Sequence, residues 1–327
     1  MAAPTNTFQT YQAKGIREDL ANVIYNISPA DTPFISNAGK ETVSNTYYEW
    51  QVDSLAAVDT TNATIEGNDA VLAQTSPTTR VGNYTQISTK TVVVSGTLEA
   101  VDKAGRRSEL VYQLAKRSKE LKRDMEAIAT GNQAANAGDA TTARNTAGFE
   151  SWLRTNAFRG SGGSNPTMSG GAGGSGYPNA APTDGTQRTF TETLLKNMVK
   201  SVYTNSVSQP PILMVGPANK QQASTFPGIA VNRYQITSPQ PGAVIGAADV
   251  YVSDFGEISV VPNRFQRERT AFGFNPEYAS IVTLRNFQQI ELAKTGDAEK
   301  RELLVEWGVK VHNEAAHGVI ADLNTSY

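Results

Sequence analysis

The chain has 327 residues, a formal net charge of -2 at neutral pH and no cysteine. The near-zero net charge excludes a strongly basic surface field that would attract nucleic acid, and the lack of cysteine excludes disulfide and thiolate chemistry. The sequence has no apolar run of about 18 residues, so it predicts no membrane span. Charged residues make up only 18% of the chain, below the roughly 25% usual for soluble domains, which suits either a neutral β-rich surface or surfaces that contact other subunits.

The first segment, residues 1–41, reads as a polar N-terminal arm. One short stretch, Ile16 to Ile24, has apolar residues at helical spacing. Pro29 and Pro33 follow, and we expect them to break any helix because proline disfavours the α region in the residue before it. The pattern predicts an extended arm with one short helical turn.

The second segment, residues 42–96, predicts a long β-hairpin. Thr42–Asp53 is aromatic and partly alternating, Arg80–Ser95 is a second strand pattern, and Gly67-Asn68-Asp69 is the favoured turn between them. Strands of about 12–16 residues reach about 40–55 Å, whereas a globule of this length has a radius of gyration of about 20 Å. An isolated hairpin is marginally stable in water, so we expect this one to project and lie on another copy of the chain.

We predict contacts between subunits at two groups of residues, one on the hairpin and one in the short basic cluster that precedes the next helix. These residues are Tyr47, Tyr48, Trp50, Arg80, Tyr84, Arg106 and Arg107.

Residues 97–185 predict a region built on one long helix, Ser108–Thr130. Its apolar residues form a single stripe, and Ser108 can cap its N-terminus. The remaining surface of this helix is densely charged, which fits a solvated face, a contact with a neighbour or a contact with nucleic acid. The glycine-rich stretch 160–176 predicts a flexible surface loop without the spacing of a phosphate-binding loop.

Residues 186–261 predict a compact α/β domain. Thr189 and Glu192 form a capping box before a helix with a clean apolar stripe, and the short apolar run Ile212–Val215 predicts a buried strand. The last segment, residues 262–327, predicts strands returning to the first region, with a hairpin turn at residues 295–297. In the final long strand, alternation predicts one core-facing and one solvated face.

No pattern in the chain predicts catalysis, a cofactor or a metal site. The only two histidines, His312 and His317, are five residues apart, whereas a zinc-protease helix needs them four apart with glutamate directly after the first. Neither a nucleophile elbow nor a nucleotide-binding glycine motif occurs. We therefore expect a structural protein and not an enzyme.

Several short stretches occur in an order that resembles one known family. They are Arg17–Leu20, Asn26–Pro29 with Asp31–Phe34, Val94–Thr97, Ala104–Arg106, Glu120–Asp124 and Asn313–Gly318. Together with the order arm, hairpin, long helix and α/β domain, they resemble the major capsid proteins of tailed bacteriophages with the Hong Kong 97-like fold, an α+β fold. The resemblance spans residues 16 to about 324, and we expect it to lapse in the glycine-rich insert.

The resemblance implies a function and a set of partners. Subunits would form hexamers and pentamers of an icosahedral shell around double-stranded DNA, which they touch non-specifically, in a virion assembled in the host cytoplasm. The parts would be the N-arm, the extended loop, the peripheral domain with its spine helix, and the axial domain. The short arm lacks a coiled-coil pattern, which favours a separate scaffolding protein alongside a portal, and no membrane partner is implied.

Three alternatives remain open at this point. The same fold could form a nanocompartment shell around a protein cargo. The chain could instead be a soluble enzyme or ligand-binding protein with a glycine-rich lid, which its lack of cysteine and its two histidines disfavour. It could also be another virion component, such as a tail protein.

Overall fold

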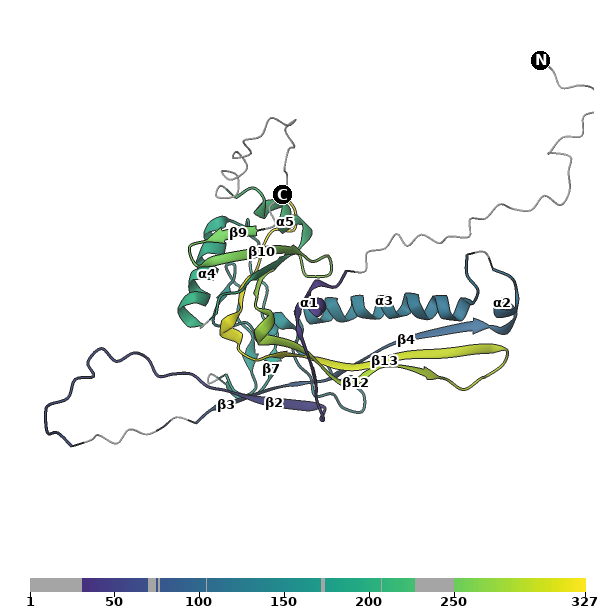
Figure 1. Cartoon of the computed structure of the whole chain (residues 1–327), viewed down its shortest axis with the longest axis horizontal. Coiled ribbons are helices and arrows are strands. Elements are labelled where there is room, and N and C mark those ends of the chain that lie inside the picture. The colour runs from purple at the N-terminus through teal and green to yellow at the C-terminus, as the bar shows by residue number, and fades with distance from the viewer. Residues whose placement is uncertain are drawn as a thin grey trace, which may run out of the picture.

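The structure is a computed structural model that describes residues 31–69, 75, 77–103, 105–171, 174–206, 208–226 and 250–327. Two sheets lie side by side, one of four strands beneath a long helix and one of six strands in a second lobe (Figure 1). The described part of the chain is therefore mixed helix and sheet, as predicted. The helical signal at residues 16–24 lies outside the described residues.

The four-stranded sheet has the order β1-β12-β13-β4. Its strands are β1 (Gly39–Thr42), β12 (Ala279–Glu291), β13 (Ala298–Val311) and β4 (Gln86–Ser95). Strand β1 runs parallel to β12, and the other pairs are antiparallel. The turn between β12 and β13 contains Gly296 at a φ of 88°, which confirms the predicted hairpin turn.

The long helix α3 (Glu109–Ala129) lies along this sheet and confirms the predicted spine helix. The Ser108 side chain accepts a hydrogen bond from the Val111 N–H, as a cap should. Leu121 and Met125 are fully buried, together with Val92 and Val94 of β4. Strand β4 continues into a short helix, α2 (Gly96–Ala100), at the far end of the molecule (Figure 1).

The hairpin is shorter than the sequence predicted. Strand β2 (Tyr47–Val52) pairs only with β3 (Thr79–Tyr84), and the chain then leaves the hairpin to form β4, which pairs with β13. The prediction that Arg80–Ser95 forms one continuous arm of the hairpin is therefore wrong, because only its first part pairs with β2. In β4, Val92 and Val94 are buried toward helix α3 and Val93 between them is exposed. Buried valines of this kind belong to a core sheet and not to a solvated arm.

The six-stranded sheet has the order β5-β14-β11-β8-β10-β9. These strands are β5 (Ala157–Phe158), β14 (Gly318–Ile320), β11 (Ala271–Phe274), β8 (Ile212–Val215), β10 (Gly256–Pro262) and β9 (Val250–Ser253). One face packs on α4 (Glu192–Asn205), with α5 (Pro217–Ala223) nearby, and the other shares a core with α3. Because both faces are covered, β8 is apolar throughout, as its sequence predicted.

The remaining elements are short. They are helix α1 (Pro33–Asn37), strands β6 (Thr167–Met168) and β7 (Pro178–Ala180), and 3-10 turns at Phe149–Trp152, Pro276–Tyr278 and Glu314–Ala316. Helix α1 begins at Pro33, which corrects the expectation that this proline only breaks a helix, since proline is well tolerated in the first turn.

Three further expectations are corrected. Helix α4 is capped by Thr191 and not Thr189, because Phe190 is fully buried and holds the preceding chain against the core. In the glycine-rich stretch, Gly176 exchanges backbone hydrogen bonds of 2.8 and 2.9 Å with Gly82 and Arg80, so this part lies beside β3. Strand β13 is buried on both faces over residues 304–309, because the base of the hairpin covers the face expected to be solvated.

Candidate assembly surfaces

The connection between β2 and β3 extends well beyond the body of the molecule (Figure 1). Over residues 53–69, three large apolar side chains are almost completely exposed: Leu55 at 99%, Val58 at 91% and Ile65 at 82%. Exposed apolar side chains on a loop that projects from the body are available for a contact with a second molecule. We name residues 53–69 the projecting loop.

The base of the hairpin is packed firmly on its own chain. The Tyr48 hydroxyl donates a hydrogen bond of 2.7 Å to the Val309 carbonyl, and the Tyr48 side chain is buried. The prediction that Tyr48 contacts another subunit is therefore wrong, because its ring fills the space over Gly308, where a Cβ would approach the hydroxyl to 2.4 Å. Sequence alternation alone could not show which strand lies opposite.

Trp50 lies on the hairpin, as predicted, but its indole packs within the chain. Its ring centroid is 5.3 Å from that of Trp152, and the Lys310 ammonium lies 5.8 Å from its ring. The indole is half-buried against the main core cluster, and its predicted contact with another subunit stays a prediction. An aspartate at this position should destabilise the subunit itself.

The other predicted contact residues keep accessible surface. The Tyr47 and Tyr84 rings pack at a tilt of 39° with centroids 4.7 Å apart and remain half-exposed, and Arg80 is an exposed partner of Glu49 across the hairpin. Arg106 pairs with Glu109 at the start of α3, and Arg107 is exposed. Their contacts with a second subunit stay predictions.

The opposite end of the molecule carries a second group of exposed apolar residues. Val93 at the end of β4, Leu98 in α2, Val101 after it and Val111 in the first turn of α3 are all exposed. We name these four residues the distal patch; they mark one end of the molecule and not one face, because Val93 points to the side of the sheet opposite the buried Val92 and Val94. It lies at the far end of the long axis from the projecting loop (Figure 1). Neither apolar group was predicted from the sequence, although isolated apolar residues in a polar stretch are a signal that could have indicated them.

The two histidines serve the structure. His312 Nε2 lies 2.9 Å from one Glu41 carboxylate oxygen, and the other oxygen pairs with Lys310 at 2.7 Å, so that Glu41 ties β1 to the rest of the sheet. His317 is fully buried, and burial lowers its pKa to about 4. Within the described ranges, no group of three histidine or acidic residues could hold a metal ion.

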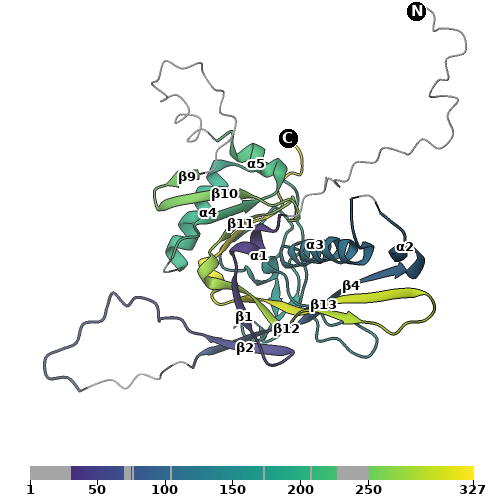
Figure 2. The same cartoon turned by 45° about the vertical axis from the view of Figure 1, so that its right-hand side comes forward.

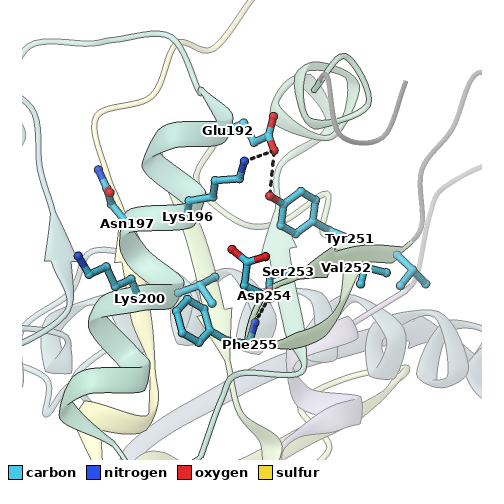
Figure 3. Close-up of a pocket in the computed structure, with 11 residues that line it drawn as sticks. Glu192, Lys196, Asn197, Lys200, Tyr251, Val252, Ser253, Asp254 and Phe255 are labelled. Carbon is cyan, nitrogen blue, oxygen red and sulfur yellow. Dashed lines mark hydrogen bonds and ion pairs between the residues drawn. The ribbon is translucent and has the colours of Figure 1, made fainter. Parts of the chain in front are cut away.

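A groove lies in the second lobe between α4 and the β9–β10 hairpin (Figure 3). Glu192 joins its two walls, pairing with Lys196 at 2.8 Å and accepting a hydrogen bond of 3.0 Å from the Tyr251 hydroxyl. Burial, followed by the interaction with Glu192, raises the pKa of Tyr251 well above its usual range. The Tyr251 hydroxyl and the Glu192–Lys196 ion pair connect helix α4 to strand β9.

No helix in the described ranges is both long and apolar enough to cross a membrane. Among the described residues, exposed apolar side chains form two groups at opposite ends of an elongated body and a third beside the groove, with Tyr203, Val250, Val252 and Phe255. Such an arrangement supplies contacts between copies of the chain.

Comparisons with known proteins agree with this geometry. A family model described as SU10 major capsid protein matches residues 3–324. The major capsid protein of Escherichia phage Phieco32 is 31% identical over 353 residues, covering 98% of this chain and 97% of that protein.

Solved structures share the fold at low sequence identity. The Cyanophage A-1(L) capsid aligns with a TM-score of 0.64 at 13% identity, over 97% of this chain and 99% of that one. An encapsulin complex from Synechococcus elongatus aligns with a TM-score of 0.53 at 9% identity, over 96% and 94%. These likenesses show the Hong Kong 97-like fold, as predicted. Because the family model and the phage relative both match nearly the whole length, the chain belongs to the SU10 major capsid protein family of bacteriophage shell proteins.

Proposed function

We propose that this phage capsid protein assembles into hexamers and pentamers of an icosahedral shell that encloses double-stranded DNA, without catalytic activity. The observation that carries the proposal is the pair of apolar surfaces at opposite ends of the subunit. A contact between two different surfaces is heterologous, and repeating it around an axis closes a ring when the rotation permits. The projecting loop of one subunit would lie on the distal patch or adjoining sheet of the next.

The exposed side chains of the projecting loop are large enough to drive such a contact. Complete burial of one leucine, valine or isoleucine side chain contributes about 1.5–3 kcal/mol. Three of them, Leu55, Val58 and Ile65, would contribute roughly 5–9 kcal/mol per loop before the cost of ordering it. A ring repeats this contact at every subunit, so weak single contacts suffice for a stable capsomer.

The test replaces the three apolar loop residues together with serine, as Leu55→Ser/Val58→Ser/Ile65→Ser. The matched control, Asn62→Ser/Thr64→Ser, changes polar residues of the same loop. Native mass spectrometry and sedimentation should find capsomers for the wild type and the control, and only monomers for the triple variant. The proposal fails if the triple variant forms the same capsomers, or if the wild type yields none. Circular dichroism should be the same for all three chains.

The likeness to an encapsulin supports one alternative, a shell around a protein cargo. The phage relative at 31% identity favours the phage capsid instead. Electron microscopy of purified particles, with their nucleic acid and protein contents measured, separates the two. Particles that hold a cargo protein and no DNA would favour the nanocompartment.

We also propose that a separate scaffolding protein and a portal take part in assembly in the host cytoplasm. The support is the composition of residues 1–41, which are polar and carry no charged coiled-coil pattern of the kind a scaffolding segment would have. Expression of this chain alone should then give capsomers or irregular particles. Regular shells of one size from the chain alone would contradict the proposal for a scaffold.

A further inference from the structure

One face of helix α3 is strongly basic. Tyr112, Lys116, Lys119 and Arg123 follow one another at spacings of four, three and four residues, which places them on a single face. Leu121 lies on the opposite, buried side of the helix, and beyond Arg123 the face of these residues ends at the buried Glu126, which the chain around Phe34 and Asn263 covers. We name Lys116, Lys119 and Arg123 the basic stripe.

The acidic residues of the helix surface are gathered on one flank of this stripe, and each has another partner. Glu109 pairs with Arg106, Glu120 pairs with Arg117 at 2.6 Å, and Asp124 pairs with Lys90 of β4 at 2.6 Å. Within the described residues, no carboxylate forms an ion pair with Lys116, Lys119 or Arg123. The positive charge of the stripe is therefore not neutralised by the subunit's described part.

The stripe is also accessible and partly preorganised. Helix α3 packs on β4, β13, α1 and α2, and the views in Figures 1 and 2 show its other side turned away from the sheet. Lys116 and Lys119 are exposed, and the Arg123 guanidinium is held 5.0 Å from the centre of the Phe265 ring. A fixed arginine loses less side-chain freedom when it binds a partner.

We propose that the basic stripe contacts the phosphate backbone of duplex DNA, so that α3 faces the inside of the shell; this rests on the proposed function. The stripe spans seven residues, about 10 Å along the helix at 1.5 Å per residue. Duplex DNA presents one negative charge per roughly 1.7 Å of its axis. The three cations would therefore lie near several phosphates wherever the helix sits along the duplex. The stripe contains no fully exposed apolar side chain, which disfavours a docked protein.

Charge complementarity of this kind binds without reading sequence. It also explains how a chain with a net charge of -2 can hold a polyanion, since the positive charge is concentrated on one face. The contact must be weak enough to leave the packaged duplex mobile, which fits a stripe of three cations.

The experiment uses the purified full chain and a short fluorescein-labelled DNA duplex, with binding followed by anisotropy. The test variant is Lys116→Gln/Lys119→Gln, which keeps side-chain length and helix propensity. The control is Lys40→Gln/Lys200→Gln, which removes two exposed lysines from other elements. A third variant, Lys116→Arg/Lys119→Arg, retains the charge.

Between about 50 and 200 mM salt, the loss of two phosphate contacts should flatten the slope of log affinity against log salt by about 1.8. The control and the arginine variant should keep the wild-type slope. A test variant with an unchanged slope, or with no more loss than the control, overturns the inference. Binding of poly-glutamate through the stripe with no binding of the duplex would overturn it in favour of an acidic protein partner.

Capsomer formation separates this inference from the proposed function. If the test variant forms capsomers but keeps the wild-type DNA slope, only the assignment of the stripe is wrong. If the test variant fails to form capsomers while the control forms them, the stripe is a contact between subunits and the inference is also wrong. If the wild type itself forms no capsomers, the proposed function fails.

Discussion

Removal of the Glu126 carboxylate should strongly destabilise the subunit. This buried side chain on α3 accepts hydrogen bonds from the Phe34 N–H at 2.7 Å, the Ile35 N–H at 2.9 Å and the Asn263 amide at 2.7 Å. The N-cap residue of α1, Thr32, makes no side-chain cap, so Glu126 caps this helix from a distant segment. One carboxylate thus joins the N-terminal segment, the spine helix and the chain after β10.

The expected magnitude follows from the burial of the donors. In Glu126→Ala, Phe34 and Asn263 would each keep a buried unsatisfied N–H, at about 1–3 kcal/mol apiece, while the half-buried Ile35 can reach water. We expect a loss of about 2–6 kcal/mol. Glu126→Gln should lose less, because its amide oxygen still accepts one of the bonds. Burial raises the pKa of Glu126, which shows that its charged form is costly in this site. Because Glu126→Ala also removes that cost, the loss of unfolding free energy should stay within about 2–6 kcal/mol.

Urea unfolding of the unassembled subunit measures this loss, and limited proteolysis of residues ahead of Pro33 reports release of the arm. The matched control is Glu120→Ala, a glutamate of the same helix that pairs only with Arg117 near the surface, where at most about 1 kcal/mol is at stake. Equal stabilities of Glu126→Ala and Glu120→Ala would refute the capping argument.

Two further predictions concern the core. His317 accepts a hydrogen bond from the Asn275 N–H at Nδ1, and burial lowers its pKa from 6.5 to about 4. Between these two pH values the unfolded chain therefore binds more protons than the folded chain. The free energy of unfolding should fall by roughly 2–4 kcal/mol in all as the pH drops from about 6.5 towards 4. His317→Gln should flatten this dependence in urea titrations at several pH values, and parallel curves for the two chains would contradict it. Trp307→Ala should cost about 3–5 kcal/mol, because the fully buried indole fills the core between the sheet and α3 and donates to the Ser88 hydroxyl at 3.0 Å. Val93→Ala on the exposed face of β4 is its control, and a loss below about 1 kcal/mol for Trp307→Ala would show that the core collapses around the gap.

Local patterns in the sequence determined the elements whose signals lie within one continuous segment of the chain. Helix α3 could be predicted because its apolar stripe and its Ser108 cap are both local signals. Strand β8 and the turn at Gly296 could be predicted for the same reason. The projecting connection was predicted as well, since a polar stretch of this length has no core of its own.

Only the tertiary structure decided which strands pair and which polar groups meet. The strand signal of residues 79–95 is continuous in the sequence, yet Thr79–Tyr84 pairs with β2 and Gln86–Ser95 pairs with β13, because the partner strand is more than 200 residues away. Tyr48 looked like an exposed aromatic until Gly308 provided the space for its ring. Glu126 looked like one more charge on a solvated helix, and its role as a cap exists only where α1 meets α3. A sequence specifies local periodicity directly, whereas long-range pairing depends on complementary shapes that no single segment contains.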